Sequence, residues 1–256
     1  MKICFFDIDG TLAIRHDIPQ SNLEMLRKLK ENGVYTFICT GRAPFYAEKM
    51  FGHLVDGIVS SNGRYITFRG ETICRKPIDD ELVVKYVALC HEVDIAYHFV
   101  SDEMMWVGNA NEIQLAAMRA SYGDERLTND RGDMEFYTFD FYYKDAEQYK
   151  WLLEVTKDDL LLNDHGIHNG QGTCDNTVLG FDKGDAIAYL IDYFNINRDD
   201  TYAFGDGYND QAMFREAGHG IAMGNGVDVL KEKAEYITDT IHNEGIRKAL
   251  EHYKLV

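Results

Sequence analysis

The chain has 256 residues, with 26 Lys and Arg against 43 Asp and Glu, so its formal charge at pH 7 is -17. This acidic balance disfavours nucleic acid, a polyanion that proteins hold with basic side chains. Hydrophobic residues make up 45% of the chain and charged residues 27%, as in globular rather than disordered proteins. The N-terminus lacks the features of a signal peptide, and no apolar run approaches the roughly 20 residues of a membrane span. We therefore expect a cytoplasmic protein without a membrane partner.

Apolar runs of strand length alternate with helical patterns over the first 80 residues, which is typical of βαβ units around a parallel sheet. The predicted elements are strands at 2–6, 35–39 and 57–60, helices at 21–32 and 44–51, and a hairpin of strands 65–68 and 71–74. Leu23, Leu26 and Leu29 recur at three-residue spacing in the first helix, and Gly33 follows its predicted end.

The pattern changes between residues 80 and 180. Here we predict helices at 81–92, 112–121 and 146–155, and strands at 95–99, 104–107 and 136–141 with further strand beyond. Aromatic residues alternate at period two, which predicts one face of a sheet, at Tyr137, Phe139, Phe141 and Tyr143. The βα rhythm returns with a helix at 183–194, a strand at 201–204, a helix at 211–217 and a strand at 220–223. The simplest account is one α/β core interrupted by an inserted α+β module.

Cysteines and histidines do not indicate a transition-metal site. The five cysteines include no Cys-x-x-Cys pair, so reduced and buried thiols are expected. His98, His165 and His168 could be imagined as ligands, but the glycines at 166, 170 and 172 predict a loop rather than the helix on which an i, i+3 pair would converge.

Acidic residues follow two of the apolar strands. Asp7-Ile8-Asp9-Gly10-Thr11 follows the first strand, and Gly205-Asp206-Gly207-Tyr208-Asn209-Asp210 follows the strand at 201–204. Each segment alone could be a turn. If the two strands are neighbours, however, carboxylates about 4 Å apart would repel by roughly 4 kcal/mol per pair at an effective dielectric constant near 20. Such a cluster requires a cation, and oxygen ligands beside phosphate favour Mg²⁺.

Four segments, in order, resemble the motifs of the haloacid dehalogenase superfamily of phosphohydrolases. Asp7-Ile8-Asp9-Gly10-Thr11-Leu12 resembles the first motif, Thr40-Gly41-Arg42 the second, Lys183-Gly184 the third, and 205–210 the fourth. Ser61-Asn62-Gly63 is similar to a segment of the Cof-type branch. The resemblance implies a Rossmann-like parallel-sheet core at 1–80 and 181–256 and an α/β cap, the substrate-specificity domain, at 81–180.

The resemblance also implies catalytic and metal-binding roles. Asp7 would be the nucleophile and form an aspartyl-phosphate, and Asp9 would protonate the leaving alcohol and then deprotonate water. Mg²⁺ would be held by a carboxylate oxygen of Asp7, the backbone carbonyl of Asp9 and the carboxylate of Asp206, with Asp210 supporting that shell.

Several further side chains and backbone groups suit a phosphate or its leaving group. Thr40 offers a hydroxyl, Gly41 an N–H and Lys183 an ammonium, although Thr40 could instead cap a helix and Lys183 could face solvent. The predicted phosphate- and substrate-binding residues are Gly10, Thr40, Gly41, Arg42, Asn62, Lys183 and Asn209. Candidate readers of the leaving group also include Arg64, Asp175 and Asn176. Two departures from the branch concern substrate selection, because 174–180 lacks a proline and Arg64 stands where a small residue is more usual.

These observations favour a Mg²⁺-dependent phosphatase that acts on a small phosphorylated metabolite, such as a sugar phosphate or a phosphorylated cofactor. One alternative is a phosphotransferase or mutase that passes the phosphoryl group to another hydroxyl. Another is a non-catalytic module that binds Mg²⁺ and phosphate, as receiver domains do, but receivers are about half as long and their acceptor Asp follows a middle strand.

Overall fold

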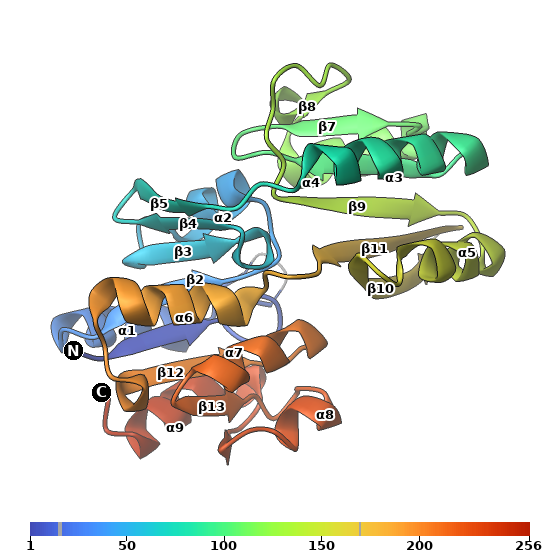
Figure 1. The fold of residues 1–256 in the computed structure, drawn as a ribbon. Helices are drawn as coiled ribbons and strands as arrows, with labels where there is room; N and C mark the ends of the chain where they lie inside the picture. Colours follow the sequence, from blue (N-terminus) through green and yellow to red (C-terminus); the bar gives the residue numbers. More distant parts are fainter. Residues whose placement is uncertain (15–16, 169) are drawn as a thin grey trace. The chain divides into compact units, whose positions relative to one another are not determined.

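The computed structural model describes residues 1–14, 17–168 and 170–256. These residues form two compact units (Figure 1). The first unit consists of Met1–Arg42, Ala47–Cys74 and Phe181–Val256, and the second of Ala43–Tyr46 and Arg75–Gly180. The inserted module was predicted at 81–180, so the second unit begins earlier than predicted and also includes Ala43–Tyr46.

The first unit is built on an eight-stranded sheet with the order β14-β13-β12-β1-β2-β3-β4-β5 (Figure 1). Its strands are β1 (Ile3–Phe6), β2 (Tyr35–Cys39), β3 (Gly57–Ser60), β4 (Tyr65–Phe68), β5 (Glu71–Arg75), β12 (Thr201–Gly205), β13 (His219–Ala222) and β14 (Tyr236–Ile237). Neighbours from β14 to β3 pair in parallel, and β4 runs antiparallel to β3. The predicted α/β fold with a parallel-sheet core is confirmed.

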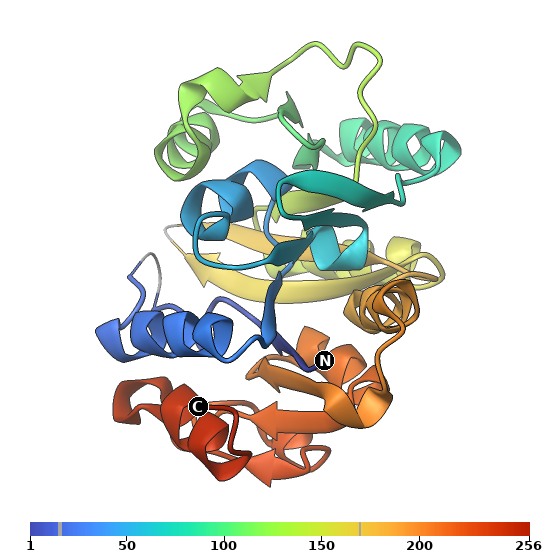
Figure 2. The same cartoon turned by 90° about the vertical axis from the view of Figure 1, so that its left-hand side faces the viewer.

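Alternation along β1 supplies two hydrophobic cores, one on each face of this sheet. Cys4 and Phe6 pack with buried residues of α1 (Gln20–Glu31) and α9 (Gly245–His252). Ile3 and Phe5 pack with α6 (Lys183–Phe194) and α7 (Gln211–Glu216) on the other face. Figure 2 shows α1 and α9 side by side, where Arg247 and Glu24 form an ion pair. The first unit also contains α8 (Asp228–Lys231), whereas α2 (Pro44–Phe51) begins in the second unit and continues into the first at Ala47.

The second unit has a six-stranded sheet with the order β10-β11-β9-β6-β7-β8. Its elements are α3 (Asp80–Val93), β6 (Ala96–Val100), β7 (Met105–Gly108), α4 (Glu112–Tyr122), β8 (Leu127–Thr128), β9 (Thr138–Tyr143), α5 (Ala146–Thr156), β10 (Leu160–His168) and β11 (Gln171–Val178). Phe139, Phe141 and Tyr143 of β9 are buried against α3 and α5. The period-two aromatic pattern is therefore confirmed as one sheet face for these three residues, whereas Tyr137, the fourth residue of the prediction, precedes β9.

The loop predicted around the histidines at 165 and 168 is wrong, because both residues lie in β10. The pairing of β10 with β11 shifts register between Asp164 and Ile167, and Gly166 within this irregularity has a φ of 75°. Glycine at a positive φ allows the strand to bulge and continue instead of ending. Nε2 of His165 lies 3.0 Å from a carboxylate oxygen of Asp175 on β11, so this histidine has a structural partner.

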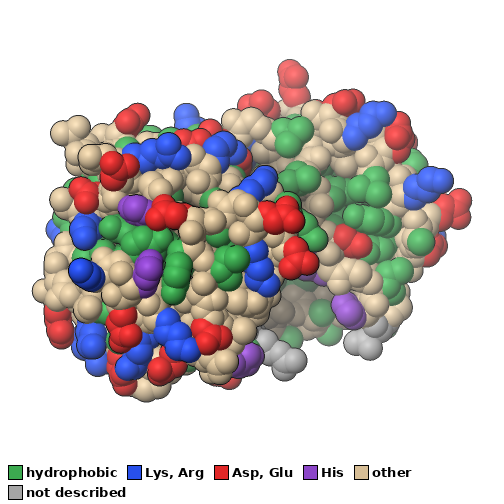
Figure 3. Space-filling view, turned by 90° about the horizontal axis from the view of Figure 1, so that it is seen from below, with side chains coloured by type: hydrophobic (Ala, Val, Ile, Leu, Met, Phe, Trp, Pro, Cys, Tyr) green, Lys and Arg blue, Asp and Glu red, His purple; other side chains and the backbone are tan. Residues whose placement is uncertain are grey.

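The surface and the thiols agree with the composition. Acidic and basic side chains are interspersed on the face shown in Figure 3, rather than gathered by sign. All five cysteines are free and buried, as predicted. Among the described residues, the helices are too short or too polar to cross a bilayer.

Candidate active site

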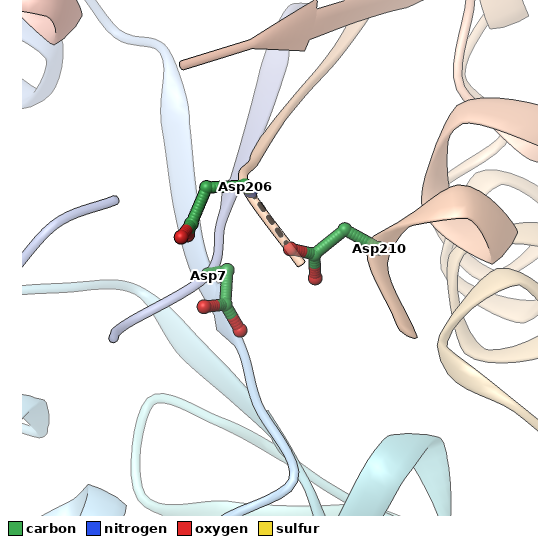
Figure 4. A group of neighbouring side chains, drawn as sticks. All are labelled: Asp7, Asp206 and Asp210. Atoms are coloured by element: carbon green, nitrogen blue, oxygen red, sulfur yellow. Dashed lines mark hydrogen bonds between the residues drawn. The ribbon is translucent and has the colours of Figure 1, made fainter. Parts of the chain in front are cut away.

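The two acidic segments meet at the carboxyl ends of adjacent strands. β1 and β12 pair in parallel with Phe6 opposite Phe204, and the N–H of Asp7 donates to the carbonyl of Phe204 over 3.0 Å. Asp206 directly follows β12, so its carboxylate and that of Asp7 lie at the same edge of the sheet (Figure 4). This edge is where ligands bind in open α/β sheets.

Lys183 joins the nucleophile candidate to the second acidic segment. It is the first residue of α6, and its side chain is 1% exposed. Its Nζ donates to Oδ1 of Asp7 over 2.7 Å and to Oδ1 of Asp210 over 2.8 Å. Burial acts to lower the pKa of Lys183, but the carboxylates of Asp210 and Asp7 outweigh it and raise this pKa, so the ammonium stays charged.

The carboxyl group of Asp7 carries an electrostatic cost. Burial raises its pKa to about 8, and the neighbouring charge of Asp210 adds to this rise while Lys183 opposes it. A second positive charge near Asp7 would therefore favour the ionised form that attacks phosphorus.

Asp210 organises the loop that follows β12. Its Oδ2 accepts the backbone N–H groups of Asp206 (2.9 Å) and Gly207 (2.8 Å), the first of which is the dashed line in Figure 4. Its Oδ1 accepts the ammonium of Lys183. Because both oxygens already accept hydrogen bonds, Asp210 is better suited to hold the loop and Lys183 than to donate directly to a cation.

Asp206 is held by the segment that follows β1. Thr11 donates its hydroxyl to Oδ1 of Asp206 over 2.7 Å. Two features favour glycine at position 10: its φ is 90°, and a Cβ there would overlap the carboxylate of Asp206. Burial raises the pKa of Asp206 to about 6, although the Thr11 hydrogen bond acts against this rise.

The acidic group fits a hard divalent cation. One oxygen from each of Asp7, Asp206 and Asp210 lies within 4.8 Å of the others. The donors are all oxygen, the ligand type that Mg²⁺ prefers, and burial of three carboxylates disfavours their joint ionisation without a further positive charge. Asp7 and Asp206 are the residues that would hold the ion, with Asp210 behind them.

The predicted phosphate loop after β2 lies against Asp9. Oγ1 of Thr40 accepts the N–H of Arg42 over 3.1 Å, which closes a tight turn. The Arg42 guanidinium donates to both carboxylate oxygens of Asp9, over 3.0 and 3.2 Å. Arg42, predicted to bind substrate, therefore pairs here with the predicted acid and base.

Other predicted residues are placed less directly. Asn209 lies in a short 3-10 turn, Tyr208–Asp210, and the ammonium of Lys183 donates to Asp7 and Asp210 rather than to it. Asn176 is 1% exposed and shares the buried face of β11 with Cys174 and Val178, whereas Asp175 lies on the opposite face.

Sequence reasoning missed two residues that hold this edge together. Thr11 lay within the first motif but was assigned no role. Asn225 was not singled out, yet its Nδ2 donates to the carbonyl of Gly10 over 2.8 Å and its Oδ1 accepts the N–H of Ile241 over 2.9 Å. The available signal was position, because Asn225 stands between two glycines shortly after β13 and so near another strand end.

Known proteins resemble the chain over its full length. A family model described as haloacid dehalogenase-like hydrolase matches residues 4–250. 5-Amino-6-(5-phospho-D-ribitylamino)uracil phosphatase YcsE of Bacillus subtilis is 27% identical over 259 residues, covering 100% of this chain and 96% of that protein. A crystal structure of a hypothetical protein from Geobacillus kaustophilus has a TM-score of 0.85 at 31% identity, covering 100% of this chain and 99% of that one. The HAD subclass IIB sugar phosphatase BT4131 has a TM-score of 0.81 at 28% identity and is covered over 100% of both chains.

Proposed function

We propose, from the premise that this chain belongs to the haloacid dehalogenase-like hydrolases and is a phosphomonoesterase, that it hydrolyses a small phosphorylated metabolite through an aspartyl-phosphate on Asp7. The observation that carries this proposal is the position of Asp7 at the end of β1, with Lys183 2.7 Å from one oxygen and Asp206 beside it. A carboxylate, a buried ammonium and an acidic cation site at one sheet edge are the parts that phosphoryl transfer from a monoester requires.

The first step transfers the phosphoryl group to Asp7. An oxygen of the Asp7 carboxylate attacks phosphorus, and the bond from phosphorus to the ester oxygen breaks. Lys183 stays charged between Asp7 and Asp210 and offsets negative charge on the transferring group. Asp9 gives a proton to the departing alkoxide, which leaves as the alcohol.

The second step returns Asp7 to its carboxylate form. Asp9 now accepts a proton from water as the water oxygen attacks phosphorus, and the bond between phosphorus and Asp7 breaks to release inorganic phosphate. Arg42 holds both oxygens of Asp9 in the structure, which fixes the carboxylate orientation. An ionised carboxylate has acceptor positions beyond the two that the guanidinium fills, so Asp9 keeps a site for the proton.

Mg²⁺ is the cation we assign to Asp7, Asp206 and the backbone carbonyl of Asp9, with Asp210 supporting this shell. When bound, it supplies positive charge that offsets repulsion between the carboxylate and the phosphate dianion. The protein's own part is to keep the carboxylates fixed, through Thr11 on Asp206 and through the backbone N–H groups on Asp210.

The substrate class we propose is a sugar phosphate or a phosphorylated cofactor. Its support is that similar proteins are named for a sugar phosphatase activity and for a phosphatase of a ribitylamino-uracil phosphate. The phosphate itself would contact Gly10, Thr40, Gly41 and Asn209 besides Lys183 and Arg42. The acidic protein would capture this anion with local positive charge and hydrogen-bond donors.

A panel of phosphate monoesters, assayed for phosphate release with Mg²⁺ and with EDTA, tests the proposal. We expect turnover of at least one sugar phosphate or phosphorylated cofactor, loss of turnover in EDTA, and loss of turnover in Asp7→Asn. Asp192→Asn is the matched control, because Asp192 is exposed on α6 away from its first turn. Wild-type turnover by Asp7→Asn would contradict the nucleophile assignment, and transfer of phosphate to an added alcohol instead of water would favour a phosphotransferase.

A further inference from the structure

The turn that follows β3 has an unusual backbone. Ser61, Asn62 and Gly63 have φ values of 50°, 53° and 106°. Such angles are in the left-handed region, which Asn visits more readily than most residues but which strains a side chain bearing a Cβ. Ser61 and Asn62 are also 0% and 6% exposed, so this strain lies inside the first unit rather than on its surface.

The same turn leaves polar atoms without hydrogen bonds. In the part of the chain that the structure describes, Oγ of Ser61 and Oδ1 of Asn62 are buried and have no partner. A buried polar atom without a partner lowers stability. Backbone strain and unpaired polar atoms, both of which lower stability, therefore occur together at Ser61 and Asn62. Such a conformation persists only where the surrounding structure fixes it.

One side of the turn fixes the predicted phosphate loop. The N–H of Asn62 donates to the carbonyl of Thr40 over 3.0 Å, and the N–H of Ser61 donates to the carbonyl of Arg42 over 3.0 Å. The Asn62 side chain also lies against Gly41, where a Cβ would lie 3.0 Å from its Oδ1. The backbone from Thr40 to Arg42 is thus held at both ends and across its middle by two residues of the turn.

The other side of the turn meets the start of α6. A Cβ at Gly63 would overlap the carbonyl oxygen of Asp182, the residue that caps α6. Lys183 follows Asp182 directly and reaches Asp7 and Asp210. The close approach that glycine permits therefore sets where the Lys183 backbone lies relative to the turn.

We infer that Ser61–Gly63 is a positioning element, which sets the spacing between the Thr40 loop and Lys183 through its left-handed backbone. This inference rests on the proposed function, because it concerns the two elements that would hold the phosphate. It assigns Asn62 a role through the backbone of Thr40, in place of a contact between its amide and the substrate. Ser61 and Gly63, which had no assigned role, are positioning residues of the same kind.

The pair Asn62→Gly and Asn62→Ala separates the two roles. Both variants remove the amide, but only glycine adopts the positive φ without strain. Positioning by the backbone predicts that kcat/KM of Asn62→Ala lies roughly 10- to 100-fold below that of Asn62→Gly, the scale of loss for a misplaced binding group. Inorganic phosphate, used as a competitive inhibitor, should bind Asn62→Ala more weakly than Asn62→Gly. Equal losses of kcat/KM and of phosphate inhibition in the two variants would overturn the inference.

Asn195→Gly and Asn195→Ala form the matched control, because Asn195 has a φ of 50° at the opposite end of α6. These two variants should differ in melting temperature but have the same kcat/KM. Gly63→Ala is a second variant that tests the inference. Its turnover should fall because the new Cβ displaces Asp182, and this result replaces the Asn62 comparison if Asn62→Ala does not fold. Wild-type turnover in Gly63→Ala would then contradict the inference. A wild-type protein that hydrolyses no monoester refutes the proposed function, and the inference with it, whereas an active wild type with equal Asn62 variants refutes the inference alone.

Discussion

Replacing Lys183 by methionine removes the positive charge between two buried carboxylates while keeping a side chain of similar length. The Lys183 side chain is 1% exposed, that of Asp7 is 12% exposed and that of Asp210 is 1% exposed. Removing one partner of a buried ion pair costs about 3–5 kcal/mol, because the remaining charge is left without compensation. We therefore expect Lys183→Met to lower the free energy of unfolding by at most an amount in this range when divalent cations are absent, because Asp7, whose pKa burial raises to about 8, can take up a proton.

Urea unfolding followed by circular dichroism measures this difference, first in EDTA and then in Mg²⁺. Because a bound cation supplies positive charge to Asp7, Mg²⁺ should return part of the lost stability to Lys183→Met. Lys248→Met is the control, since Lys248 forms an exposed ion pair with Asp239 and its side chain is 50% exposed. An exposed pair contributes about 0–1 kcal/mol. Equal unfolding midpoints for wild type and Lys183→Met in EDTA would refute the argument that this ammonium compensates the buried carboxylates.

Three further changes have defined outcomes. Arg42→Ala should alter the free energy of unfolding by less than about 1 kcal/mol, because the Arg42 and Asp9 side chains are 35% and 43% exposed. In a double-mutant cycle, the loss of kcat/KM in the Arg42→Ala, Asp9→Asn double variant should be smaller than the sum of the two single losses. Gly10→Ala should weaken Mg²⁺ binding by about 10- to 100-fold in titration calorimetry, because the new Cβ displaces the Asp206 carboxylate. Asp182→Asn should destabilise the protein near pH 7 but not in acid. Burial acts to raise the pKa of Asp182, but hydrogen bonds from Arg215 and from backbone N–H groups of α6 outweigh it and lower this pKa. The Asp182 contribution is therefore complete above the unfolded pKa of about 4 and is lost as the pH falls through the lower folded value, which urea midpoints across pH will show.

Each of these outcomes has a contrary result. Additive losses in the Arg42 and Asp9 cycle would mean that the two side chains act independently. Gly70→Ala is the control for Gly10→Ala, because Gly70 also has a positive φ but a Cβ there would meet nothing within 4 Å. Equal Mg²⁺ affinity in the two glycine variants would contradict the steric argument. A stability difference for Asp182→Asn that persists at pH 2 would show that its charge is not the cause.

The meeting of Asp7 and Asp206 could be predicted from sequence because strand ends in a parallel sheet have a fixed direction. Two apolar strands, each followed by an acidic turn, leave one open question, namely whether the strands are neighbours. The pairing of β1 with β12 answers it. The same logic applies to Asn225 near the end of β13, but a single Asn between glycines is a common turn and gives no chemical signal by itself.

The interactions that sequence did not predict are those set by side-chain direction. Arg42 follows Thr40-Gly41 in a motif that suggested substrate contact, yet its guanidinium lies on Asp9. The left-handed backbone of Ser61 was equally hidden, because the Ser61-Asn62-Gly63 segment indicates only a turn. The strand through His165 was missed because the glycines at 166, 170 and 172 predicted a loop, whereas Gly166 lies where β10 and β11 shift register.

Chemical trapping of the phosphorylated enzyme tests the central claim most directly. The enzyme is mixed with Mg²⁺ and a phosphate monoester that it hydrolyses, and the reaction is quenched during turnover. The quenched protein is treated with borohydride, which reduces an acyl phosphate to an alcohol. The peptide that contains residue 7 is then sequenced by mass spectrometry. We predict homoserine at position 7 and unchanged aspartate at position 9. In Asp7→Asn we predict no homoserine at either position. Aspartate unchanged at position 7 in an enzyme that is releasing phosphate, or homoserine at another aspartate, would contradict the assignment of Asp7 as the nucleophile.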